Sequence, residues 1–268
     1  TGQSKVMTYD GRFRLGCKGV LYLLLEPFEA SEPLIDAFDS HMMHRNPLMI
    51  HSHFVKKDQH LGSFGSYLLN AKKEAIPFSA QLQSDDDPEM EVFAQEMSPK
   101  FRLTIVGAEH DAVKLCQQAS FLGWEIEVMC SMSNPKSTAH FLGAKKVIPM
   151  TPDLFAQHPL EAGSAIVLMT HNYALDFKYL MTLVDRKVSY LGILGSSARR
   201  ERLFDELFEY APEVDSEFLE TFHSPAGLNI GSETPEEIAL SIVSEILAIK
   251  RQKKPFSLKE FAGSIHSS

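Results

Sequence analysis

The chain has few cysteines, no excess of positive charge and no long apolar run, and each absence excludes a class of protein. Its three cysteines, Cys17, Cys116 and Cys130, have neither metal-type spacing nor the density of a disulfide framework, which favours a reducing cytoplasm. The net charge of -9 argues against a nucleic-acid or acidic-membrane binder. No apolar stretch approaches the roughly 20 residues of a membrane span. We therefore expect a cytoplasmic protein without a membrane or nucleic-acid partner.

What remains is the composition of a globular protein, with 44% hydrophobic and 23% charged residues over 268 positions, a length that suits two domains. Residues 1–82 predict a small α+β module. The apolar run Val20–Leu25 predicts a buried strand, and 48–55 and 66–70 predict two more. A helix capped at Ser31 is expected between them. Its predicted apolar face consists of Leu34, Ile35, Phe38 and Met42.

The acidic, turn-forming stretch at 83–89 predicts a solvated linker over 83–100. Residues 101–268 follow as a second domain in which strands and helices alternate. Strands are expected at 101–106, 125–130, 146–148, 165–169 and 188–193, and helices at 110–122, 135–142 and 173–184. This alternation predicts an α/β fold with a Rossmann-like, doubly wound parallel sheet of strand order 3-2-1-4-5. The ligand crevice should lie between the first and fourth strands.

The turn after the first of these strands departs from the dinucleotide-binding fingerprint. Gly107 begins it, but Glu109 stands where the fingerprint needs a second glycine. A carboxylate there repels a pyrophosphate at close range. Met129, Cys130 and Ser131 follow the second strand, where an acidic residue would hold the ribose. We therefore expect NAD(P) to bind weakly or not at all.

A second Gly-rich turn follows the fifth strand and is suited to an anion. Gly195 precedes Ser196 and Ser197, whose hydroxyls and backbone N–H groups stand at a helix start. Arg199 and Arg200 add two positive charges at a helix end that disfavours cations. The sequence predicts a bound anion or an acidic partner at this turn.

A shaped loop at 223–231 ends at a strong helix start. Thr234 is expected as the N-cap, with Pro235 in the first turn and Glu237 completing a capping box. Together with the 190–200 segment, this stretch closely resembles the C-terminal half of the xanthine dehydrogenase accessory family of XdhC/CoxI type. The matching residues are Leu194, Gly195, Ser196, His223, Pro225, Gly227, Leu228, Ile230, Gly231, Thr234 through Ala239, Ser241, Ile242, Glu245 and Ile246.

The resemblance implies an accessory or chaperone role in the maturation of molybdenum hydroxylases. Such a protein would bind molybdenum cofactor (molybdopterin) and aid its sulfuration or insertion, with a xanthine dehydrogenase-type molybdoenzyme and a cysteine desulfurase as partners. The phosphate of the cofactor would then rest on the 195–200 helix start. The residues implied to lie near the pterin are His110, the Thr170–His171–Asn172 step after the fourth strand, and His223 and Gly227.

Cys17 resembles the family's thiol position because Gly16 and Gly19 surround it and Lys18 would favour a thiolate. The resemblance implies that Cys17 contacts molybdenum or carries its sulfur. We expect the N-terminal module to lack the family's first segment, which bears a Gly-Gly-Cys motif. A homodimer is also expected, because strand-rich edges in the N-terminal module need cover.

Two alternatives stay open. The same crevice could serve an NAD(P)-dependent oxidoreductase, in which Arg199 and Arg200 accept a 2′-phosphate, or the domain could be a scaffold without a ligand. The sequence contains no Ser-His-Asp order, P-loop or metalloprotease motif, so no catalytic residue is predicted. His51 and His53 share one face of a strand and offer two metal ligands, but no Cys or carboxylate follows at ligand spacing. We interpret them as strand-face histidines at a surface or interface.

Overall fold

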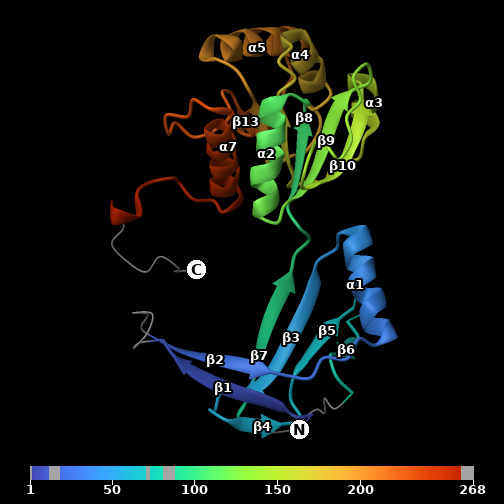
Figure 1. The fold of residues 1–268 in the computed structure, drawn as a ribbon, viewed down its shortest axis with the longest axis vertical. Helices are drawn as coiled ribbons and strands as arrows, with labels where there is room; N and C mark the ends of the chain where they lie inside the picture. Colours follow the sequence, from blue (N-terminus) through green and yellow to red (C-terminus); the bar gives the residue numbers. More distant parts are fainter. Residues whose placement is uncertain (1, 12–18, 71–72, 81–87, 261–268) are drawn as a thin grey trace. The chain divides into compact units, whose positions relative to one another are not determined.

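The computed structural model describes residues 2–11, 19–70, 73–80 and 88–260, and the chain divides into two units, Thr1–Pro99 and Lys100–Ser268 (Figure 1). The first unit contains β1 (Ser4–Asp10), β2 (Val20–Leu25), α1 (Glu32–His44), β3 (Leu48–Val55), β4 (His60–Gly62), β5 (Ser66–Leu69), β6 (Ala75–Pro77) and β7 (Met90–Met97). Its described strands form an antiparallel sheet of order β6-β5-β3-β7 and a smaller sheet of order β2-β1-β4. Leu34 of α1 packs against Leu48 and Leu68 on one face of the larger sheet.

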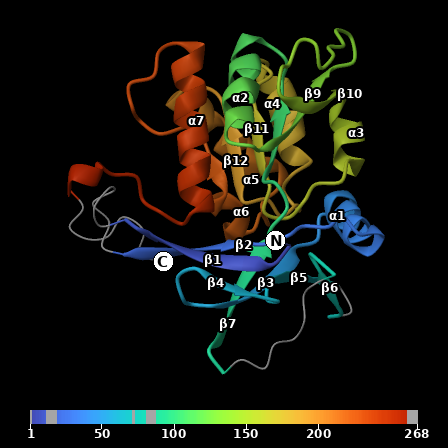
Figure 2. The same cartoon turned by 60° about the horizontal axis from the view of Figure 1, so that its bottom comes forward.

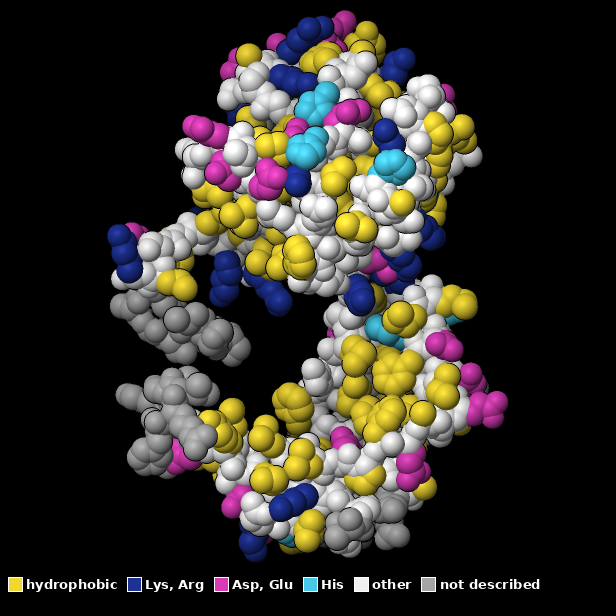
Figure 3. Space-filling model, viewed as in Figure 1, with side chains coloured by type: hydrophobic (Ala, Val, Ile, Leu, Met, Phe, Trp, Pro, Cys, Tyr) yellow, Lys and Arg dark blue, Asp and Glu magenta, His cyan; other side chains and the backbone are white. Residues whose placement is uncertain are grey.

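The linker prediction was wrong for residues 90–97. They form β7, which pairs with β3 along its whole length, so the first unit extends to Pro99. β7 lies at the edge of the larger sheet, and its side chains, including Val92 and Phe93, are nearly all exposed. Hydrophobic side chains accordingly gather on the surface of this unit (Figure 3).

Two burial predictions in this unit also fail. The apolar run of β2 is not buried, because β2 is the edge strand of the small sheet and Leu21, Leu23 and Leu25 are each about half exposed. On α1, Leu34 is buried but Ile35 and Met42 are exposed. The sheet contacts a narrower stripe of the helix than its apolar residues define.

The second unit contains the predicted Rossmann-like sheet. Its elements are β8 (Arg102–Val106), α2 (His110–Phe121), β9 (Glu125–Ser131), β10 (Ala144–Met150), α3 (Pro152–Gln157), β11 (Ala165–Leu168), α4 (Tyr173–Met181), β12 (Tyr190–Ile193), α5 (Ser197–Tyr210), α6 (Ser216–Glu220), β13 (Phe222–His223), α7 (Pro235–Lys250) and the short η1 (Leu258–Glu260). The described strands are parallel and follow the order β10-β9-β8-β11-β12-β13. The predicted order of the first five strands is confirmed, and β13 adds a sixth.

The two faces of this sheet carry separate cores. Helices α2 and α7 lie side by side over one face, where Leu115 and Ile242 pack against strand residues such as Ile105 (Figures 1 and 2). On the other face, Phe155 of α3, Leu180 of α4 and Leu203 of α5 join a second core. The predicted capping box at the start of α7 is confirmed, because Thr234 and Glu237 exchange side-chain to backbone hydrogen bonds.

The helix predicted at 135–142 does not form. Successive turns take its place, with Asn134 N–H bonded to Ser131 and His140 N–H bonded to Ser137. Pro135 has no N–H to donate, and Ser131, Ser133 and Ser137 make local side-chain hydrogen bonds that compete with a helix. The connection from β9 to β10 is therefore an irregular loop at the carboxyl edge of the sheet.

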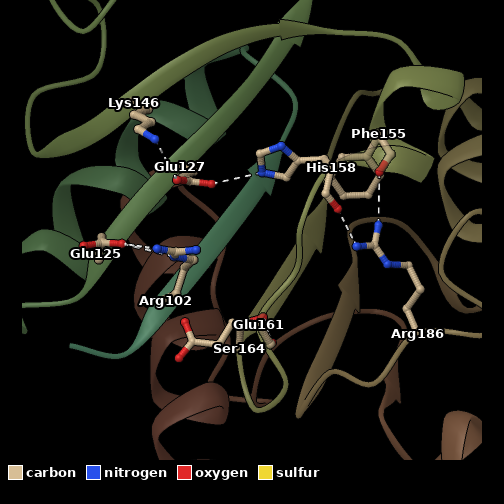
Figure 4. Close-up of polar contacts among 9 residues, drawn as sticks. All are labelled: Arg102, Glu125, Glu127, Lys146, Phe155, His158, Glu161, Ser164 and Arg186. Carbon is tan, nitrogen blue, oxygen red and sulfur yellow. Dashed lines mark hydrogen bonds and ion pairs between the residues drawn. The ribbon is translucent and has the colours of Figure 1, made fainter. Parts of the chain in front are cut away.

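Ion pairs occupy the amino edge of the sheet and the face beneath α3 (Figure 4). Arg102 contacts the carboxylate of Glu125 at 2.6 Å. Lys145 contacts the same carboxylate at 2.5 Å. Glu127 is buried, with its carboxylate 3.2 Å from Nε2 of His158. Arg186 donates to the backbone carbonyls of Phe155 and His158 and so fixes the end of α3. Both carboxylates are thus paired with basic side chains.

Candidate functional site

A cavity of about 390 Å³ lies at the carboxyl edge of the parallel sheet, over β8, β9 and β10. Its wall combines the β8–α2 turn, the loop after β9, the start of α3 and the inner side of α4. The lining residues are Val106, Gly107, Ala108, Glu109, Met129, Cys130, Ser131, Met132, Ser133, Asn134, Met150, Thr151, Pro152, Thr170, Leu175 and Tyr179. This edge is where ligands bind in open parallel sheets.

The backbone of the β8–α2 turn lies close to Met169, which follows β11. Gly107 has φ +140°, and a Cβ at this position would lie 2.3 Å from the carbonyl oxygen of Met169. Its N–H donates to the carbonyl of Met129 at 2.9 Å. Glycine is thus required by the positive φ and by the close approach of this turn to Met169. This glycine alone is no sign of a phosphate.

The side chain of Glu109 in this turn is exposed and makes no capping hydrogen bond. Glu109 is the N-cap residue of α2 and lies on the cavity wall. A carboxylate at a helix start is electrostatically favoured. His110 follows it and is also exposed, near Glu236 of α7, which is paired with Lys114 at 2.9 Å.

The loop after β11 is held by a buried carboxylate. Asp176 accepts from both the N–H and the hydroxyl of Thr170, at 3.1 Å and 2.7 Å. Asn172 caps α4 by accepting from Leu175 N–H. His171 adopts a left-handed backbone with φ 56°, and its Nε2 lies 3.1 Å from a carboxylate oxygen of Asp111 on α2. This contact joins the start of α2 to the loop after β11, at the switch point of the sheet.

The turn after β12 is open, but one of its arginines is not free. Gly195, Ser196 and Ser197 are exposed, and Ser196 caps α5 by accepting from Arg199 N–H at 3.3 Å. Arg199 pairs with the buried Asp176 at 2.5 Å, so the prediction of two available cations is wrong for this residue. Among the described contacts, Arg200 has no carboxylate partner. An anion at this helix start would meet backbone N–H groups and one arginine.

A second polar cluster lies on the opposite face of the sheet, beneath α7. Glu245 accepts from the Tyr190 hydroxyl at 2.6 Å and from Gly227 N–H at 2.8 Å, and its carboxylate is 3.6 Å from Nδ1 of His223. The rings of Tyr190 and His223 stack with centroids 4.6 Å apart. Burial raises the pKa of Glu245, but these hydrogen bonds outweigh it and hold the pKa below its ordinary 4.5. Burial beside this carboxylate raises the pKa of Tyr190 well above 10.

Comparison with known proteins identifies the domain. The family model described as the XdhC Rossmann domain matches residues 103–246, more than half of the chain. The chain belongs to the XdhC family. The resemblance seen in the sequence is thereby confirmed, and with it an association of this family with xanthine dehydrogenases.

Two relatives and one solved structure are similar to this XdhC-family chain. A Bacillus subtilis (strain 168) protein, named as a probable subunit of xanthine dehydrogenase, is 27% identical over 246 residues, covering 88% of this chain and 71% of that protein. The uncharacterized protein YqeB of Escherichia coli (strain K12) is 30% identical over 179 residues, which span 62% of this chain but 30% of that protein. The crystal structure of a xanthine dehydrogenase from Bacillus halodurans matches with a TM-score of 0.74 and 25% identity, over 94% of this chain and 77% of that one.

The structure gathers some of the residues that the family resemblance singles out and separates others. Gly107 and Thr170 line the cavity, His110 begins α2 beside it, and His171 and Asn172 lie on the loop after β11. The 195–200 turn follows β12, which neighbours β11 in the sheet. Asp176 joins the turn to the cavity, because it contacts both Thr170 and Arg199. His223 and Gly227 belong to the cluster beneath α7 and are not among the residues that line the cavity. Cys17 lies outside the described residues.

Sequence reasoning missed most of the wall of the cavity in this XdhC-family chain. The segments 129–134 and 150–152 follow the second and third strands and line it, as the carboxyl-edge rule would have indicated. Cys130 is among them, with its Sγ accepting from Lys136 N–H at 3.4 Å. Cys116 is buried in α2, and burial raises the pKa of its thiol to about 11. Over the described residues, no group of three or more His, Cys, Asp or Glu is arranged to hold a metal ion. Nor does any described helix combine the length and apolarity that crossing a membrane requires.

Proposed function

We propose that this XdhC-family chain is an accessory protein for the maturation of xanthine dehydrogenase-type molybdenum hydroxylases, and that it binds molybdenum cofactor in the cavity at the carboxyl edge of its parallel sheet. The family membership and the names of two similar proteins support the association with a molybdoenzyme. The cavity carries the proposal of a bound cofactor. No catalytic residue is assigned.

The cavity has a size and lining that fit a pterin. Its volume of about 390 Å³ falls in the usual range for small-molecule sites, roughly 300–1,000 Å³. Met129, Met150 and Leu175 supply apolar surface for the faces of a flat ring system. The hydroxyls and amide of Ser131, Ser133 and Asn134 supply hydrogen-bonding groups for its polar edge. The bound cofactor supplies the molybdenum centre, whereas the protein binds and orients it.

Glu109 should favour binding of a pterin over binding of a dinucleotide in this cavity. A carboxylate about 4 Å from a phosphate is repelled by about 1 kcal/mol in water and about 4 kcal/mol at the surface of a protein. The amino-pyrimidine edge of a pterin instead presents N–H donors, and a hydrogen bond to a charged group contributes about 1.5–3 kcal/mol. Because Glu109 has no capping bond of its own to give up, it is available to accept them.

The phosphate end of the cofactor is proposed to lie toward the 195–200 turn. Ser196 and Ser197 are exposed at the start of α5, where backbone N–H groups attract an anion. Asp176 contacts both Arg199 in this turn and Thr170 on the cavity wall, and so fixes the two ends of the site relative to each other. Cys17 as the sulfur-handling thiol and a cysteine desulfurase as the sulfur donor remain predictions from the family resemblance.

The test is equilibrium binding of molybdopterin, extracted from a molybdenum hydroxylase, to the full chain and two variants. Glu109→Gln should weaken binding at least about tenfold, the equivalent of 1.4 kcal/mol. Glu217→Gln is the matched control, because Glu217 is likewise an exposed acid in the first turn of a helix. NADPH is measured in parallel and should bind weakly. Tight NADPH binding with no uptake of molybdopterin would replace this function with the oxidoreductase alternative.

A further inference from the structure

A tyrosine flanked by two histidines lies on the larger sheet of the first unit. The Tyr67 hydroxyl of β5 is 3.3 Å from Nδ1 of His51 and 3.2 Å from Nε2 of His53, both on β3. His51 pairs directly across from Tyr67, and His53 is two residues along the same strand, so the three side chains share one face. The sequence pattern pairs the two histidines but gives no sign of the third group.

The two contacts of the Tyr67 hydroxyl are hydrogen bonds, and their lengths are also those of ligand pairs around one metal ion. Two ligands of a tetrahedral zinc ion, each about 2.05 Å from the metal, lie about 3.3 Å apart. The Tyr67 hydroxyl lies 3.2 Å from Nε2 of His53 and 3.3 Å from Nδ1 of His51. A metal ion bound to the hydroxyl oxygen would therefore lie close to both imidazole nitrogens.

His51, His53 and Tyr67 are half-buried, on the face of the sheet that α1 does not cover. α1 packs through Leu34 on Leu48 and Leu68, whose side chains belong to the opposite face of the sheet. On β7, the small Val92 and Ala94 stand opposite the two histidines.

We propose that His51, His53 and Tyr67 form a binding site for a divalent first-row transition-metal ion such as Zn²⁺, with the fourth position taken by water. Imidazole nitrogens suit such an ion, and the Tyr67 oxygen would be its third ligand. The described residues offer no additional Cys, Asp or Glu that would complete a group of three with the histidines, so the coordination stays open. This site is independent of the cofactor cavity in the second unit.

The test is calorimetric titration of the tag-free, metal-free full chain with Zn²⁺, and with Co²⁺ as a spectroscopic probe. We expect one ion per chain and visible Co²⁺ bands typical of tetrahedral coordination. His53→Ala and Tyr67→Phe should each lower the Zn²⁺ affinity more than about tenfold. His44→Ala is the matched control, since His44 is exposed at the end of α1 and outside the cluster, and it should leave the affinity unchanged.

Circular dichroism of each variant guards against a loss of folding, and Tyr67→Phe keeps the ring that packs against both imidazoles. An absence of saturable Zn²⁺ binding to the wild-type chain would overturn the proposal. So would one-to-one binding that His53→Ala and Tyr67→Phe leave intact, because the ion would then be held elsewhere. Uptake reduced equally by His44→Ala would point to adventitious binding by exposed histidines and would overturn it as well.

Discussion

Replacing Asp176 with asparagine should destabilise the second unit strongly, because it leaves a cation without its partner. Asp176 is fully buried, and Arg199 is 21% exposed at its side chain. An asparagine oxygen can still accept both hydrogen bonds from Thr170, but its amide would direct N–H groups at the guanidinium. Removing one partner of a buried ion pair costs about 3–5 kcal/mol. Arg199 already has a buried Nε without a hydrogen-bond partner, so little nearby can compensate.

The assay is thermal unfolding followed by circular dichroism, with the transition of the Lys100–Ser268 unit assigned by its helical signal. At about 2–4 °C per kcal/mol for a domain of this size, the loss corresponds to a fall in Tm of about 6–20 °C. Glu206→Gln is the control, on the same helix as Arg199. It breaks the more exposed Arg202–Glu206 pair, which should cost about 0.3–0.5 kcal/mol.

A double variant separates the charge effect from a packing effect. Asp176→Asn combined with Arg199→Met removes the stranded cation, and the pair should recover most of the stability lost by Asp176→Asn alone. A single variant within about 1 kcal/mol of the wild type would refute the reasoning. A double variant no more stable than the single one would refute it equally.

Three further predictions concern α7 and the loop before it, and each is checked by unfolding measurements. Gly227→Ala should lower the free energy of unfolding by about 2–5 kcal/mol, because φ is +108° and a Cβ would lie 2.4 Å from Ser241 Oγ. Gly163→Ala is its control: φ is +83° but the space is open, so the loss should be only roughly 1–2 kcal/mol. The pKa of Glu245 is lowered, so its contribution to the stability of the fold is fully present above pH 4.5 and is lost as the pH falls below that value. Glu245→Gln should flatten this part of the profile of stability against pH, and an unchanged profile would contradict the assignment. Thr234→Ala should cost about 1 kcal/mol through loss of the capping box, and a neutral effect would contradict its role.

The sheet order and the α7 start were predictable because local patterns fix them. Alternating strands and helices restrict a parallel sheet to few orders, and the capping box at Thr234 consists of residues three apart in sequence. The exposed strand β2 was not predictable. Its apolar run looks like a core strand, and only the pairing of strands shows that it lies at an edge.

The site was predictable only in part, for a similar reason. The carboxyl-edge rule located Gly107 and Thr170 on the cavity wall. It does not reveal that Asp176, which has no partner recognisable from spacing, would bind Arg199 from 23 residues away. Nor does spacing show that His223 faces Glu245 beneath α7 while the cavity lies on the other side of the sheet. Such contacts depend on tertiary packing, which no local pattern encodes.

The most direct test of the central claim is hydrogen–deuterium exchange of the full chain with and without molybdopterin. If the cofactor binds in the cavity, amides in 107–111, 129–134 and 150–152 should become protected, because these segments line it or adjoin its wall. The cluster beneath α7, including Gly227, should exchange as before. Protection confined to 223–228 and the facing part of α7, with the cavity segments unchanged at saturating molybdopterin, would place the cofactor on the opposite face and contradict the account.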